Sequence, residues 1–183
     1  MESVGFKEWA IVCEALGRGE QTVLLRKGGI TEGRDGFGFR HSGFFLFPTF
    51  FHEQLDKVRI SGAEIPKARE GEIEIRYFAK LVQQEEITSW PTAAALEPFH
   101  IWQGSVVRER FDYKHAGLHV ALVRVFRLVP DWIFPDARAY GGCRSWVKLP
   151  ECPAKTRFEA VLSDRDHEER VEMFDAVASA SYR

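Results

Sequence analysis

The sequence predicts an α+β fold with a curved antiparallel or mixed β-sheet of about seven strands and about three helices, the last one C-terminal. Three observations predict it. Apolar β-prone runs follow one another instead of alternating regularly with helices. Hydrophobic residues make up 45% of the 183 residues and charged residues 28%, as in ordinary globular proteins. No repeat or Pro- and Ser-rich linker divides the chain, so we expect residues 1–183 to form one domain whose sheet curves toward a partial barrel.

The N-terminal part supplies two strands, a third short strand and a helix. Residues 8–16 and 21–27 are apolar and β-prone, and the glycines between them predict a β-hairpin. Residues 44–47 predict a short buried strand that Pro48 ends, because proline donates no ladder hydrogen bond. A threonine then caps a helix predicted over residues 50–58, whose apolar residues share one face.

The middle of the chain predicts a half-exposed strand, a short helix and a buried strand. Residues 72–82 alternate between apolar and polar side chains, which indicates a strand near a sheet edge. Residues 89–97 predict a short helix with Pro91 near its start. Residues 117–129 are apolar on both faces, which is typical of a central strand covered on both sides.

The C-terminal part predicts two more strands and the last helix. Residues 144–149 and 158–162 have the composition of short strands. Ser163 and Asp166 form a capping box, so a helix is expected from there to about residue 178. Acidic side chains in its first turn suit the positive end of the helix dipole.

The first candidate site is the glycine-rich stretch that follows the second predicted strand. Lys27 stands beside Gly28 and Gly29, where an ammonium group and free backbone N–H groups would bind phosphate. The GxxxxGK[ST] pattern is missing, so this is not a Walker loop. The alternative interpretation is a strand exit whose glycines provide positive φ angles.

The second candidate site combines two histidines with one glutamate. His41, His52 and Glu32 would hold a divalent metal such as zinc, manganese or iron as cofactor. One histidine would otherwise act as a general base in catalysis, since imidazole titrates near neutral pH. The competing interpretation is a hydrogen-bonded histidine pair that braces the loop. A cysteine zinc site or a disulfide frame is not expected, because the three cysteines form no CxxC pair.

The third candidate site lies in the basic part of the chain. The net charge is −2, yet residues 101–157 hold 10 Lys and Arg against 5 Asp and Glu. Trp102 with Arg108 and Arg110 would stack a base and contact the phosphates of a nucleic acid. A core tryptophan with solvated arginines explains the same residues, and the basic segment would then balance acidic neighbours in the fold.

An arginine in the predicted central strand is the last candidate. Arg124 stands among apolar neighbours, where a buried charge needs an opposite charge or an anionic ligand. It would therefore bind phosphate, or it would pair with Glu14 or Glu74.

Five segments together resemble a bacterial family known as domain of unknown function 1802. They are FKEWAIVCEALGRGEQTVLLRKGGI, FFLFPTFFHEQ, HIW, GLHVALVRVFRL and GCRSWV. The resemblance implies a bacterial source and an intracellular single-domain protein. It implies no activity, cofactor or site residue.

The residues themselves favour a ligand that carries phosphate, either nucleic acid or nucleotide, and a phosphoester hydrolase if the protein is catalytic. The alternatives are a non-catalytic RNA- or DNA-binding β-module and a protein–protein adaptor, which would expose an apolar patch. No membrane partner is expected, because no apolar run is long enough to cross a bilayer. The N-terminus lacks the features of a signal peptide, which predicts a cytoplasmic location.

Overall fold

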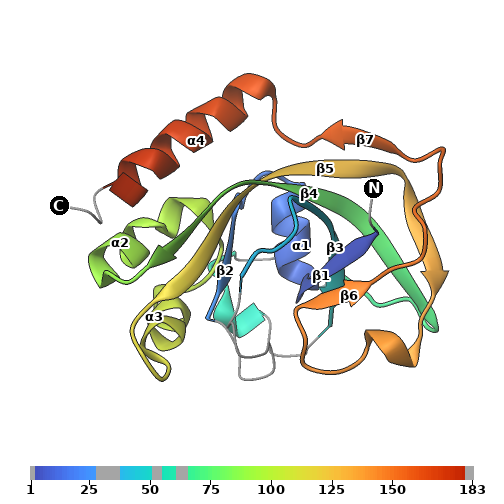
Figure 1. Ribbon diagram of the computed structural model, residues 1–183, viewed down its shortest axis with the longest axis horizontal. Helices are drawn as coiled ribbons and strands as arrows, with labels where there is room; N and C mark the ends of the chain where they lie inside the picture. Colours follow the sequence, from blue (N-terminus) through green and yellow to red (C-terminus); the bar gives the residue numbers. More distant parts are fainter. Residues whose placement is uncertain (1–2, 28–37, 51–54, 61–65, 180–183) are drawn as a thin grey trace.

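The chain folds into a seven-stranded mixed sheet that stays open, with helices packed against it (Figure 1). The computed structural model describes residues 3–27, 38–50, 55–60 and 66–179. Within these residues there are four α-helices, and the last is C-terminal. The predicted α+β class with its curved mixed sheet is confirmed.

The sheet has the strand order β2-β5-β4-β3-β1-β6, and β7 pairs with β5 beside β2. Strands β1 and β3 are parallel, whereas the other pairs are antiparallel. Figure 1 shows β4 and β5 as long curved ribbons that arch over α1. The strands are β1 (Val4–Trp9), β2 (Val23–Arg26), β3 (Gly43–Thr49), β4 (Glu72–Ile87), β5 (Leu118–Pro135), β6 (Trp146–Lys148) and β7 (Arg157–Ala160).

The helices gather at one end of the sheet and on one of its faces (Figure 1). The final helix begins as predicted, because the hydroxyl oxygen of Ser163 accepts a hydrogen bond from the Asp166 N–H at 3.1 Å. Phe174 docks this helix and is fully buried. The helices are α1 (Ala10–Gly17), α2 (Trp90–Ala95), α3 (Gly104–Asp112) and α4 (Asp164–Ser179), with 3-10 turns η2 (Leu55–Lys57), η3 (Glu97–Phe99) and η4 (Arg138–Tyr140).

The predicted N-terminal hairpin is wrong. Most of the segment predicted as its first strand is helix α1, and the true first strand, β1, lies before it. Six of the eight helix residues are buried, so the segment is apolar all round and has no amphipathic stripe. An apolar run of this length fits a buried strand or a buried helix equally well. Strand β2 consequently pairs with β5 instead of a hairpin partner.

Two further predictions need correction, and one helix was missed. Strand β3 continues through Pro48, which lies where β3 pairs with β1 but not with β4. Strand β4 is paired on both sides and extends to Ile87, so it is not an edge strand. Helix α3 had not been predicted at all. The helix predicted over residues 50–58 lies partly outside the described residues, and its described part includes the 3-10 turn η2.

Two apolar clusters occupy the two faces of the sheet. Phe44 belongs to the larger cluster, which also contains α1 and the ring of Trp102. Phe45 belongs to the smaller one with Trp132. Successive residues of a strand point to opposite faces, so these neighbours separate the two clusters. Among the helices of the described residues, none has the length and apolarity to span a bilayer.

Candidate functional site

An open hollow of about 530 Å³ lies where β3 begins, beside β1 and β4. We call it the cationic hollow, because its lining includes Arg40, Lys80 and the imidazole of His41. No Asp or Glu occurs among the described residues that line it. The remaining lining residues are Val4, Ser42, Gly43 and Phe78.

The register of β3 and β4 builds this hollow. Gly43 lies opposite Lys80, and the N–H of Leu81 donates to the carbonyl oxygen of Ser42 at 2.9 Å. A Cβ atom at Gly43 would lie 2.6 Å from Cζ of Phe78. Glycine is therefore required at this position, because it leaves room for the Phe78 ring beside the start of β3.

The imidazole of His41 packs against a strand on the other side of β1. Its ring centroid lies 4.8 Å from that of Trp146, and the rings meet edge to face at 62°. Trp146 in turn contacts Phe6 and Phe44 of the larger core cluster. The core thus supports the ring that orients His41, while Arg40 beside it is exposed.

Positive charge continues from the cationic hollow onto β5. Arg124 lies directly opposite Lys80, and directly paired residues project from the same side of a sheet. Two like charges in this position repel each other, which favours an anion near them. Arg124 forms an ion pair with Asp164 at the start of α4 and is 28% exposed. Its partner is therefore neither Glu14 nor Glu74, the two predicted carboxylates.

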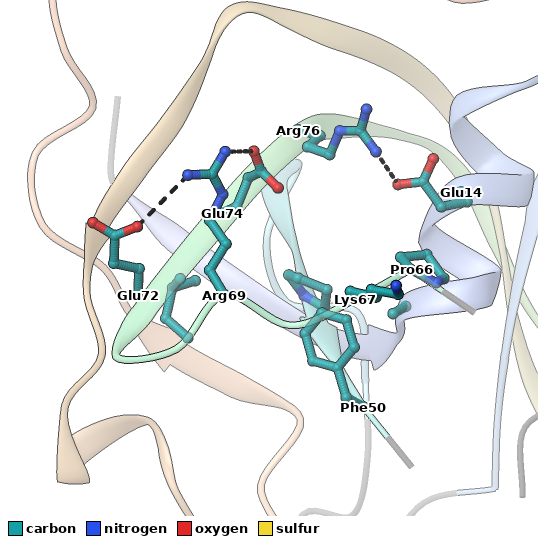
Figure 2. Close-up of a pocket in the computed structure, with 11 residues that line it drawn as sticks. Glu14, Phe50, Pro66, Lys67, Arg69, Glu72, Glu74 and Arg76 are labelled. Atoms are coloured by element: carbon teal, nitrogen blue, oxygen red, sulfur yellow. Dashed lines mark hydrogen bonds and ion pairs between the residues drawn. The ribbon is translucent and has the colours of Figure 1, made fainter. Parts of the chain in front are cut away.

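A second hollow, of about 40 Å³, has both of its arginines in ion pairs and is called the ion-pair hollow (Figure 2). Arg76 Nη1 lies 2.8 Å from Glu14 Oε1. Arg69 lies between two carboxylates, 3.1 Å from Glu74 and 3.7 Å from Glu72. These pairs join α1 to β4 and the chain before β4.

A tyrosine outside the hollow shares one of its carboxylates. The hydroxyl of Tyr77 donates to Glu14 Oε2 at 3.0 Å. Burial, followed by the negative charge of Glu14, raises the pKa of Tyr77 to about 12. The phenol therefore stays neutral at physiological pH. Glu14 is matched by a guanidinium and a hydroxyl, so this hollow has the character of a structural network.

A known protein family matches most of the chain. The family model described as "Domain of unknown function (DUF1802)" matches residues 5–173. The chain belongs to this family. The resemblance inferred from the five sequence segments is thereby confirmed.

The fold of this DUF1802 protein is similar to solved structures of ASCH from Zymomonas mobilis. ASCH is 12% identical, the match covers 93% of this chain and 94% of that chain, and the TM-score is 0.46. One mutant of ASCH is 12% identical with coverage of 94% and 96% and a TM-score of 0.46. A likeness at this level supports no conclusion about function. No curated protein matches the chain.

Lys27 occupies a structural position in this DUF1802 protein. Its ammonium group donates to the carbonyl oxygens of Phe111 at 3.0 Å and Gly117 at 2.8 Å, and also to that of His115. These carbonyls lie at and after the end of α3, where a cation satisfies exposed acceptors. All three ammonium donors are used, so Lys27 has none left for the predicted phosphate, and it is not grouped with His41.

The predicted stacking residues lie together, but not as a surface for bases. Trp102 is only 1% exposed, and the Arg110 guanidinium covers its ring at 3.8 Å. Arg108 pairs with Asp112 and lies 4.6 Å over Trp90. The tryptophan is a core residue, and no ring face is open for the predicted base stacking.

The other predicted site residues lie outside the described part of the chain. They are Gly28, Gly29, Glu32 and His52. The metal or catalytic set of Glu32, His41 and His52 therefore remains a prediction. Within residues 3–27, 38–50, 55–60 and 66–179, no group of three or more His, Cys, Asp or Glu side chains could hold a metal ion.

Sequence reasoning missed two residues of the cationic hollow. Arg40 is adjacent to the predicted His41 in the sequence, and this adjacency could have assigned it to the site. Lys80 had the pattern of an ordinary solvent-facing strand residue. Its position opposite Gly43 and Arg124 depends on strand register, which local alternation does not determine.

Proposed function

We propose that this protein binds a phosphate-bearing ligand, nucleic acid or nucleotide, in the cationic hollow. The observation that carries the proposal is the lining: Arg40, His41 and Lys80 without an Asp or Glu among the described lining residues. Arginine and lysine are the usual partners of phosphate in proteins. The volume of about 530 Å³ falls within the range of small-molecule sites.

The charge pattern supports a polyanion over a single phosphate. Lys80 and Arg124 face each other across β4 and β5, so cationic side chains continue from the hollow to β5, where Asp164 offsets the charge of Arg124. Lys80 makes no ion pair with any described residue, and a phosphate would neutralise it. An open hollow on a sheet admits a strand of nucleic acid that enters on one side and leaves on the other.

The proposal is limited to binding. His41 is the one lining residue, among those described, with an imidazole side chain. A histidine general base is usually oriented by a further polar group, and the predicted set would need Glu32 or His52. Hydrolysis of a phosphoester is therefore an outcome for the experiment to reveal.

The test is a titration of a short fluorescein-labelled single-stranded RNA or DNA, and of a labelled nucleotide, followed by fluorescence anisotropy. We expect Arg40→Gln combined with Lys80→Gln to weaken oligonucleotide binding by about 10- to 100-fold at low salt. The slope of log K against log salt should fall by about 1.4, because each lost contact with a single strand removes about 0.7. Lys67→Gln is the matched control, since Lys67 is an exposed lysine of the ion-pair hollow.

Several results would decide against the proposal. Equal affinity in the double variant and the wild type would exclude the cationic hollow, and so would an equal loss in Lys67→Gln. Absence of binding to all three probes would exclude phosphate-bearing ligands of these kinds. Cleavage of the oligonucleotide that disappears in His41→Ala, with binding retained, would extend the function from binding to catalysis.

A further inference from the structure

A buried cluster of charged and aromatic residues lies beneath α3, apart from both hollows. The guanidinium of Arg110 lies 3.8 Å from the ring centroid of Trp102 and 5.8 Å from that of Trp9. The two indoles meet edge to face at 4.8 Å. An arginine that stacks on an aromatic ring is held in one plane, and its N–H groups point outward along the edges of that plane.

One nitrogen of this guanidinium has no hydrogen-bond partner. Arg110 Nη1 is buried, and no acceptor lies within reach of it among the described residues. Burying a cationic donor without an acceptor costs free energy, because the group loses its hydrogen bonds to water and forms none with the protein. Native proteins rarely leave such a group unsatisfied unless a ligand or an ordered water occupies the position.

The nearby carboxylate cannot supply the missing acceptor. Glu8 is 2% exposed, and its Oε2 lies 3.1 Å from Arg26 Nη1. Its Oε1 accepts a hydrogen bond from the N–H of Trp9 at 2.8 Å. Arg26 also donates to the carbonyl oxygen of Lys7. The cluster thus holds two guanidinium groups, those of Arg26 and Arg110, against one buried carboxylate, and the exposed Glu109 adds a further negative charge near Arg110.

The other charged neighbours of the cluster give Arg110 Nη1 no acceptor. Arg59 is already paired with Glu97 at 3.3 Å, so neither offsets the cluster. His100 is 4% exposed, and burial followed by Arg59 and Arg110 lowers its pKa to about 4, which keeps it neutral. Burial lowers the pKa of Arg110 to about 10, so the guanidinium is still charged at neutral pH.

We infer that Arg110, which lies over Trp102 and Trp9, and Arg26, which lies over Phe6, form a binding position for one oxyanion, a phosphate or a carboxylate group. The anion would accept a hydrogen bond from Arg110 Nη1 and balance the second guanidinium. The Arg26 side chain is 20% exposed and Arg110 is partly buried, so the cluster lies near the surface although Nη1 itself is buried. This inference does not depend on the function proposed for the cationic hollow.

The experiment is a titration of the whole protein with sodium phosphate, and separately with sodium acetate, at constant ionic strength maintained with chloride. Thermal unfolding and tryptophan fluorescence are the measurements, because Trp9 and Trp102 adjoin the position. We expect a saturable rise in Tm and a saturable fluorescence change in the wild type. Both should vanish in Arg110→Met, whose Tm in chloride should equal or exceed that of the wild type, since the unpaired charge is gone.

Two controls separate this position from its neighbours. Arg108→Met removes an arginine from the same helix that also stacks on a tryptophan but is paired with Asp112, and it should keep the response. Lys80→Gln should keep it as well, which distinguishes the inferred position from the cationic hollow. A response to phosphate alone or to acetate alone would support the inference and name the group that binds.

Other results would overturn the inference. They are the absence of a saturable response to either anion, an equal response in Arg110→Met, or loss of the response in Lys80→Gln. If Arg110→Met does not fold, Arg110→Lys is measured instead, because lysine keeps the charge but lacks the planar fork. The half-saturating anion concentration should then rise at least about tenfold, and an unchanged value would also overturn the inference.

Discussion

The cationic hollow and the ion-pair hollow contain similar residue types but differ in the acidic residues among their described lining. In the ion-pair hollow, Arg76 has Glu14, and Arg69 lies between two carboxylates (Figure 2). In the cationic hollow, Arg40 and Lys80 share a lining without an acidic residue among those described. The comparison shows that charged residues in a hollow indicate a ligand site only when their ion-pair partners are known.

The origin of the difference lies in which strands and helices meet. Helix α1 brings Glu14 to β4, so a helix supplies the carboxylate that a strand arginine needs. At the other hollow, β4 meets β5 with Lys80 opposite Arg124, a pairing that stabilises nothing by itself. The first arrangement joins a helix to the sheet, whereas the second forms no ion pair between the two strands.

The largest loss of stability is expected from overpacking the contact between α1 and Tyr77, next to the ion-pair hollow. In Gly17→Ala the new Cβ atom would lie 2.0 Å from Cζ of Tyr77, whose hydroxyl donates to Glu14. We expect the free energy of unfolding to fall by about 3 kcal/mol, measured by urea denaturation. Gly104→Ala is the control, because a Cβ there meets nothing within 4 Å. Equal stability of Gly17→Ala and the wild type would show that the contact between α1 and Tyr77 is loose.

An intermediate loss of stability is expected at alkaline pH, where Tyr77 of the same network ionises. The folded-state pKa of Tyr77, about 12, lies above its ordinary value of 10.0. The unfolded chain therefore releases this proton first, so stability is complete below about pH 10 and is lost as the pH rises toward 12. Between these values we expect Tyr77 to account for a loss of about 2 kcal/mol.

The measurement is urea denaturation of the wild type and Tyr77→Phe at several alkaline pH values. The phenylalanine variant should be less stable near neutral pH by about 1 kcal/mol, because one hydrogen bond is lost. The difference should shrink and then reverse as the pH rises. Parallel curves for the two proteins would contradict the raised pKa.

The smallest effect concerns the cationic hollow and has the opposite sign. Lys80→Gln removes one of two like charges that face each other across β4 and β5, so we expect a gain of about 0.3 kcal/mol. Lys67→Gln, on the other hollow, should change stability little, because it is an exposed side chain. Precise denaturation curves at low salt measure both. A loss above about 1 kcal/mol in Lys80→Gln would mean that Lys80 supports the fold.

Much of the fold followed from local patterns, and the exceptions have a common cause. The start of α4 was predicted because the capping of Ser163 and Asp166 is a local interaction. Helix α1 was predicted as a strand because complete burial removes the periodicity that distinguishes the two. Pro48 did not end β3, because the strand has a single partner there, and the number of partners is a property of the sheet.

The candidate site was likewise predicted only in part from local sequence. His41 was selected from sequence, and the structure places it beside Arg40 and Lys80 in the cationic hollow. Trp102 and Arg110 were correctly grouped, but the sequence could not show that one covers the other. Lys27 met the chemical requirement for phosphate, yet backbone carbonyls more than eighty positions away occupy its ammonium group.

By itself, the sequence determined the α+β class, the interior position of β5 in the sheet, the C-terminal helix and the family. These depend on apolar patterns and capping residues that lie within a few positions of one another. Only the tertiary structure decided which charges are paired, because ion pairs such as Arg76 with Glu14 join residues far apart in the chain. Strand register and helix docking set those distances.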